Sequence, residues 1–402
     1  MSDIQLLEQI LQSALLMDSG DDLRARFKSR LDDLDISFNQ AESWLGITKK
    51  SLNNIFDGKA KTISVTNLLK IGDFLGLNDL NTLLEIYVSN LPKEAIADFE
   101  RANRAKYIVQ NFDIAGLKDV GFLSQTKDFN QIEDRIVGYF DLDSIFDYES
   151  NVGVVFSRSK GNPNQKMINF WLASARKYFH DLANPNDYNR DHLVSIIKQI
   201  KPYCQDEEKG LIIVTQALFK AGVSIVYQPY VPNTQIRGAT IIVNDKPCII
   251  ITDLRKNYGT LWFTLMHELF HVLYDLEEIK SMNGHLSDEK SPDLLIKEYR
   301  ADEFARNYFF GRESINYIKP FIGNHGLVIR QADKHEIHPA IIYNNFAWEM
   351  MKTKKKNFWP LVNKYSPDIS GLLKKINRSM WDWENIAKEA VGVRETLHSL
   401  KK

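Results

Sequence analysis

Two histidines four positions apart, with a glutamate directly after the first, are the strongest candidates for chemistry in this chain. They are His267 and His271, with Glu268 between them, in an apolar, helix-compatible run from Trp262 to Tyr274. Residues four apart lie on one face of a helix, so both imidazoles can bind one metal ion. The H-E-x-x-H spacing is typical of zinc hydrolases, in which the glutamate is the general base. We therefore expect Zn²⁺ at the two histidines and catalysis by Glu268.

A third ligand is needed, because zinc hydrolases use three protein ligands and leave a fourth position for water. Glu298 and Asp302 lie four apart on an amphipathic helix that the pattern predicts over Lys297–Phe310. We expect Glu298 to complete the ligand set and Asp302 to accept the second ring N–H of His267. Glu303, on another face, is the rival ligand. The plainer alternative is a core helix with two hydrogen-bonded histidines and a solvated acidic pair.

The residues around this motif resemble the ImmA/IrrE family of zinc metallopeptidases, which are gluzincins. The resemblance rests on the E-x-x-A-D pattern after H-E-x-x-H and on stretches at residues 222–226, 237–239, 254–256, 262–271, 298–305 and 337–346. It implies a mixed α+β, zincin-like domain with a helical C-terminal part and a His, His, Glu zinc site. Phe270 stands where family members often have Gly or Ala, but this departure removes no ligand.

Residues 22–77 have the pattern of a bundle of short helices. We expect helices over Asp21–Leu34, Phe38–Leu45, Lys49–Phe56 and Val65–Leu75, with Ser37, Thr48 and Ser64 as N-caps of the last three. The run Leu45-Gly46-Ile47, followed by Leu52, Ile55 and Gly58, resembles the XRE-type helix-turn-helix of phage repressors. That resemblance implies a DNA operator as a partner, bound through residues 37–58.

In such folds the helix after the turn enters the major groove. The base-contacting residues would be Lys49, Lys50, Asn53 and Asn54, and the phosphate-contacting ones Lys59 and Lys61. Two positions depart from the family: Phe38 replaces a common Gln, and Glu42 replaces a small buried Ala. The alternative is a four-helix module for dimerisation or partner docking.

Composition limits the possible classes of function. The net charge is −1, so a DNA partner would need a local basic patch. No apolar stretch reaches the roughly 18 residues that a membrane span needs, and the first residues do not form a signal peptide. Cys204 and Cys248 lie far apart and suggest a reducing compartment, so we expect a cytoplasmic protein without a disulfide framework.

The rest of the chain places the metal motif in an α+β domain. We expect a helix over Leu211–Ala221, a strand over Val223–Tyr227 and a hairpin of Arg237–Val243 with Cys248–Thr252 before the metal helix. The expected layout is a helix-turn-helix domain at 1–78, a helical connector at 79–190, a zinc peptidase domain at 191–350 and a basic helical tail at 351–402. Weaker candidates for chemistry are Tyr274, His285, Tyr299, Arg300 and His338.

These patterns lead to two functional hypotheses. The first is a regulatory zinc endopeptidase with a DNA-binding head that cleaves a repressor or a toxin–antitoxin partner. The second is a DNA-binding antitoxin or repressor whose peptidase-like domain binds a partner protein without proteolysis. XRE heads often dimerise, so a homodimer is expected under both hypotheses.

Overall fold

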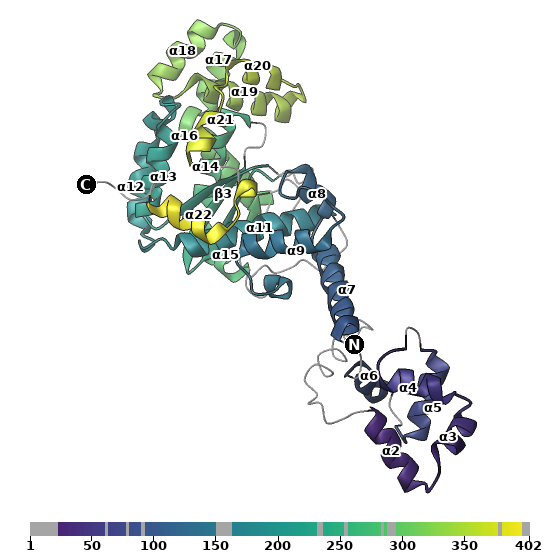
Figure 1. The fold of residues 1–402 in the computed structure, drawn as a ribbon. Coiled ribbons are helices and arrows are strands. Elements are labelled where there is room, and N and C mark those ends of the chain that lie inside the picture. Colours follow the sequence, from purple (N-terminus) through teal and green to yellow (C-terminus); the bar gives the residue numbers. More distant parts are fainter. Residues whose placement is uncertain are drawn as a thin grey trace. The chain divides into compact units, whose positions relative to one another are not determined.

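The computed structural model describes residues 23–60, 63–77, 80–89, 93–149, 163–230, 236–252, 256–282, 285–287, 295–376 and 380–395 (Figure 1). The expectations on Asp21, Lys61 and residues 254–255 lie outside the described residues. The chain forms two compact units, residues 1–106 and 107–402. It is an α+β protein with a helical majority and one small mixed sheet, as the sequence predicts. No helix of the described part is long and apolar enough to cross a membrane.

Short helices with well-defined ends make up the first unit. They are α2 (Leu23–Asp33), α3 (Phe38–Leu45), α4 (Lys49–Phe56), α5 (Val65–Phe74), α6 (Leu80–Ser89) and most of α7 (Lys93–Asn111). The side chains of Ser37, Thr48 and Ser64 accept the predicted capping hydrogen bonds, and Gly46 ends α3 with φ of 60°. Phe27 lies at the centre of the core, with its ring 4.9 Å from that of Phe56.

The sheet has the strand order β1-β3-β2-β4. Its strands are β1 (Ser224–Gln228), β2 (Gly238–Val243), β3 (Lys246–Thr252) and β4 (His285–Ser287). β1 pairs parallel with β3, whereas β2 is antiparallel to both β3 and β4. The predicted β2–β3 hairpin is present. Its turn residues Asn244 and Asp245 have φ of 51° and 60°, as a tight turn between twisted strands requires.

One face of the sheet is covered by the helix that carries the H-E-x-x-H motif, α14 (Tyr258–Tyr274), which contacts β2 and β3. Around α14 lie α16 (Leu295–Phe310) and α19 (Pro339–Lys354). The remaining helices of this layer are α12 (Arg190–Ile200), α13 (Gly210–Lys220), α17 (Arg312–Ile318), α18 (His325–Lys334), α20 (Trp359–Tyr365) and α21 (Ser370–Ile376). The short helix α15 (Leu276–Met282) follows α14 and contacts β2. Ile225, Ile249 and Ile251 are buried in the core of this face.

The alternating strand residues Val226, Cys248 and Ile250 are buried in the core on the opposite face. The elements there are α8 (Ile114–Asp119), α9 (Phe129–Phe140), α11 (Pro163–Leu182) and α22 (Ile386–Val393). Both faces of the sheet are therefore covered, which explains why most residues of β1, β2 and β3 are buried whichever face they point to.

The structure differs from the predicted connector and tail. Residues 108–148 and 167–182, expected as part of a connector, form one core with the sheet, and the division of the chain lies at 106/107 instead of 78 and 190. Residues 380–390 of the predicted tail are packed in the same core, where α22 contacts α11. The reason is apolar burial, since Trp381 and Trp383 are 2% and 3% exposed. Of the basic run, Lys352 and Lys354 to Lys356 are exposed.

Candidate metal centre

Helix α14 fixes the H-E-x-x-H residues inside the second unit. Asn257 caps its first turn by accepting a hydrogen bond from the Thr260 backbone N–H. Gly259 lets α19 approach closely, because a Cβ there would lie 2.7 Å from the Asn344 Cβ. The side chains of the motif are consequently desolvated.

Four atoms of three side chains meet beside this helix: one ring nitrogen from each histidine and both carboxylate oxygens of Glu298. His267 Nε2 lies 3.2 Å from Glu298 Oε2, His271 Nε2 lies 3.2 Å from Glu298 Oε1, and the two Nε2 atoms are 3.2 Å apart. Ligand atoms that surround zinc as a tetrahedron with bonds of about 2.0–2.1 Å are separated by about 3.3 Å. This buried group could hold a metal ion.

Each histidine has a carboxylate at its other ring nitrogen. His271 Nδ1 lies 2.8 Å from Asp275 Oδ2 in a hydrogen bond. His267 Nδ1 is 3.1 Å from Asp302 Oδ1, the predicted partner, although the angle falls short of a hydrogen bond. Because a carboxylate only accepts, Nδ1 carries the proton and Nε2 presents a lone pair. Sequence reasoning missed the role of Asp275, although its position four residues after His271 on the same helix was the available signal.

The electrostatics of the site favour a cation among these groups. Burial alone would lower the pKa of His267, but its contacts with Asp302 and Glu298 outweigh burial and raise the pKa to about 9. The pKa of His271 is raised in the same way, by Asp275 and Glu298. Without a metal, the carboxylates thus stabilise a second proton on the imidazoles, at Nε2; a metal cation that replaced these protons would face the same carboxylates.

Asp302 is held as an anion by its surroundings. Burial alone would raise its pKa, but His267, Arg237 and Arg306 together lower the pKa below its usual value. Arg237 Nη1 and Arg306 Nη2 lie 4.0 and 3.7 Å from the Asp302 carboxylate. The guanidinium of Arg237 also lies 4.6 Å from the ring centre of Trp348.

Glu268 is fully buried against β2. Its Oε2 accepts a hydrogen bond of 2.8 Å from the Thr240 hydroxyl. Its Oε1 has no hydrogen-bond partner among the described residues and lies beside Gly238, where a Cβ would be 2.5 Å away. A buried carboxylate oxygen without a donor is costly in a merely structural residue, so this arrangement fits a group that meets a reactant.

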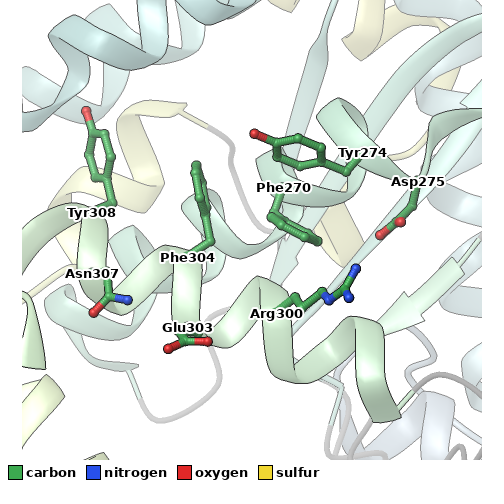
Figure 2. Close-up of a pocket in the computed structure, with 8 residues that line it drawn as sticks. All are labelled: Phe270, Tyr274, Asp275, Arg300, Glu303, Phe304, Asn307 and Tyr308. Carbon is green, nitrogen blue, oxygen red and sulfur yellow. The ribbon is translucent and has the colours of Figure 1, made fainter.

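Glu303, the rival ligand, and the weaker candidates Arg300 and Tyr274 line a pocket of about 620 Å³ between α14 and α16 (Figure 2). Its aromatic lining is Phe270, Tyr274, Phe304 and Tyr308, and its polar lining is Asp275, Arg300, Glu303 and Asn307. Glu303 does not belong to the group of described residues that could hold a metal ion, which is His267, His271 and Glu298. Asp275 lines this pocket and also contacts His271.

Three weaker candidates remain, namely His338, Tyr299 and His285, and the structure places them as follows. His338 caps α19 by accepting from the Ala340 N–H, and its Nε2 lies 2.9 Å from Glu207. Tyr299 is half exposed, with the Lys352 ammonium 4.7 Å from its ring centre. His285 lies in β4.

The predicted DNA-contacting residues share helix α4 of the first unit. Lys49 and Lys50 are exposed in its first turn, whereas Asn53 and Asn54 are half-buried. The Lys49 backbone N–H donates to Glu42 at 2.9 Å, which gives Glu42 a place as a second cap of this helix.

Lys59, a predicted phosphate contact, already has an acidic partner in the first unit. The Lys59 ammonium lies 3.3 Å from Asp57, which also pairs with Arg24. That cluster reduces the positive charge that Lys59 offers to a phosphate.

Comparison of the chain with protein-family models, curated proteins and solved structures found no match.

Proposed function

We propose that this chain is a zinc-dependent endopeptidase, with Zn²⁺ held by His267, His271 and Glu298 and with Glu268 as the general base. The observation that carries the proposal is the meeting of the two Nε2 atoms, 3.2 Å apart, with the Glu298 carboxylate, each nitrogen 3.2 Å from one of its oxygens and each imidazole backed by a further carboxylate. Two imidazoles and one carboxylate suit zinc, and three protein ligands leave a position for a reactant.

The zinc would supply Lewis acidity, which lowers the pKa of water and polarises a carbonyl group. The chain's own residues would do the rest. Glu268 takes a proton from the attacking water and passes it to the amine that leaves. Asp302 and Asp275 keep the imidazoles in the orientation and tautomer that bind a metal.

A protein target is the substrate class that the family resemblance supports, and a repressor or a toxin–antitoxin partner would fit a regulator with a helix-turn-helix. The two cysteines of the chain are both free and buried, which agrees with a cytoplasmic setting.

The test uses one ligand variant and a matched control on the same helix. Zinc content is measured by mass spectrometry on the wild type, Glu298→Ala and Glu303→Ala. We expect about one zinc per chain in the wild type and in Glu303→Ala, and a sharp loss in Glu298→Ala. No zinc in the wild type after reconstitution, or equal loss in both variants, would overturn the ligand assignment.

Proteolysis is tested separately with a library of fluorescence-quenched peptides and zinc-loaded protein. Glu268→Gln should keep its zinc and lose cleavage, because the amide cannot accept the proton. Cleavage that survives this substitution would exclude Glu268 as the base.

The second candidate function is a DNA-binding antitoxin or repressor that binds its partner without cutting it. The exposed Lys49 and Lys50 in the first turn of α4 favour a role for this helix in binding DNA. Under this candidate, the double variant Lys49→Ala, Asn53→Ala loses operator binding in a gel-shift assay, whereas partner neutralisation persists in Glu268→Gln. Neutralisation that is lost in Glu268→Gln would favour the peptidase instead.

A further inference from the structure

We infer that Thr240 is a positioning residue for Glu268 and that it decides which carboxylate oxygen handles the proton. Thr240 holds Oε2, and Oε1 is the oxygen that accepts the proton. This inference rests on the proposed function, because it concerns the base of the same reaction.

Strand β2 brings Thr240 directly to the carboxylate. Both residues are fully buried, and the Thr240 hydroxyl donates to Glu268 Oε2 at 2.8 Å. A hydrogen bond to an ionised acceptor in a desolvated place is stronger than one between neutral groups. The pairing of β2 with β3 and with β4 at this position, Thr240 with Ile249 and with His285, keeps the strand in place.

The hydrogen bond removes a freedom that a glutamate otherwise has. The last torsion of a glutamate side chain is broad and nearly two-fold, so its two oxygens can exchange. The hydrogen bond to Oε2 restricts rotation of the carboxylate about its last torsion, so Oε1 stays in one orientation. Oε1 has no hydrogen-bond partner among the described residues, and the missing side chain at Gly238 leaves it room.

The proton transfer can then be assigned to atoms. As the water oxygen forms its bond to the peptide carbonyl carbon, one water O–H bond breaks and an O–H bond forms at Oε1. When the peptide C–N bond breaks, the same proton moves from Oε1 to the leaving nitrogen. The Thr240 hydroxyl donates to Glu268 Oε2, so we infer that it acts on the reaction by holding the base.

The test compares Thr240→Val, which keeps the shape and removes the hydroxyl, with Thr240→Ser, which restores a hydroxyl. Thr215→Val is the matched control, since Thr215 is also buried, in α13, with its hydroxyl donating to the Leu211 carbonyl. On a peptide that the wild type cleaves, we expect kcat of Thr240→Val to fall about 10- to 100-fold with unchanged KM and zinc content. Thr240→Ser should recover most of this loss. Unchanged kcat in Thr240→Val, or a serine variant as slow as the valine variant, would overturn the inference.

A second measurement does not depend on catalysis. The carboxylate band of Glu268 is isolated as the infrared difference between each zinc-loaded protein and its Glu268→Gln counterpart. We expect the band to shift in Thr240→Val and to return in Thr240→Ser. An unshifted band would overturn the inference even if no peptide were ever cleaved, whereas absence of cleavage with a shifted band would count against the proposed function alone.

Discussion

Asp275 supports a residue of the candidate metal centre without belonging to the group that could hold the ion. It is the C-cap of α14 and contacts Nδ1 of His271, whereas Nε2 of the same ring faces Glu298. This contact fixes the tautomer and raises the basicity of the imidazole.

We therefore predict that Asp275→Asn lowers zinc affinity about 10- to 100-fold, measured by competition with a chelator. Glu277→Gln serves as a control, because Glu277 is paired with Lys280 on the exposed surface of α15. Equal affinity in Asp275→Asn and the wild type would show that the backing carboxylate is dispensable.

Gly238 matters because it has no side chain, which leaves space for the Glu268 carboxylate. A Cβ at this position would lie 2.5 Å from Glu268 Oε1 and 2.9 Å from Thr264 Cγ2. We predict that Gly238→Ala displaces the carboxylate and lowers kcat on a cleavable peptide about 100-fold while the zinc stays bound. Wild-type turnover in this variant would mean that Oε1 has more room than its packing indicates.

At the scale of elements, the close contact of α14 with α19 depends on the absence of a side chain at Gly259. We predict that Gly259→Ala destabilises the second unit by about 1–3 kcal/mol in urea unfolding, because the methyl group meets Asn344 and the Ala340 carbonyl. Gly138→Ala is the control of opposite sign. Gly138 is exposed in α9 with open space around it, so alanine should stabilise by about 0.5–1 kcal/mol. The same sign for both would contradict the packing argument.

Local patterns predicted α2 to α5, α13, the strands β1 to β3, α14 and α16, and the reason is that the signals of these elements are local. The three capped helices and the β2–β3 hairpin depend on residues within a few positions, such as Ser37, Gly46 and Asn244. The ligands His267, His271 and Glu298 could be proposed because helical spacing sets which side chains share a face.

What the sequence did not show is which faces pack together. An amphipathic pattern in α11 or α22 indicates an apolar side but not its partner, so both were assigned outside the domain that they complete. The same limit hid the parallel pairing of β1 with β3 and the contact of Thr240 with Glu268, since each joins residues about 20 or more positions apart.

At the scale of the molecule, the C-terminal segment is part of the core of the second unit. The Trp383 ring stacks on Tyr178 at 5.8 Å, and Arg135 donates to the Trp381 carbonyl at 2.7 Å. We predict that Trp383→Ala destabilises the second unit by about 3–5 kcal/mol in urea unfolding. Lys356→Ala, exposed in the preceding basic run, should change it by less than about 0.5 kcal/mol. Equal losses of stability in Trp383→Ala and Lys356→Ala would favour the predicted basic tail over a segment packed in the core.

Because α11 packs against α22, its packing can be completed only late in the synthesis of the chain. The two helices are separated by roughly 200 residues, so at about 5–20 residues per second α11 waits about 10–40 s for its partner. During that time the apolar side of α11, with Phe170 and Trp171, lacks the segment that covers it in the finished fold. The candidate metal-binding residues of α14 and α16 are synthesised within this interval. The second unit can therefore complete the packing around α11 only after translation has reached α22.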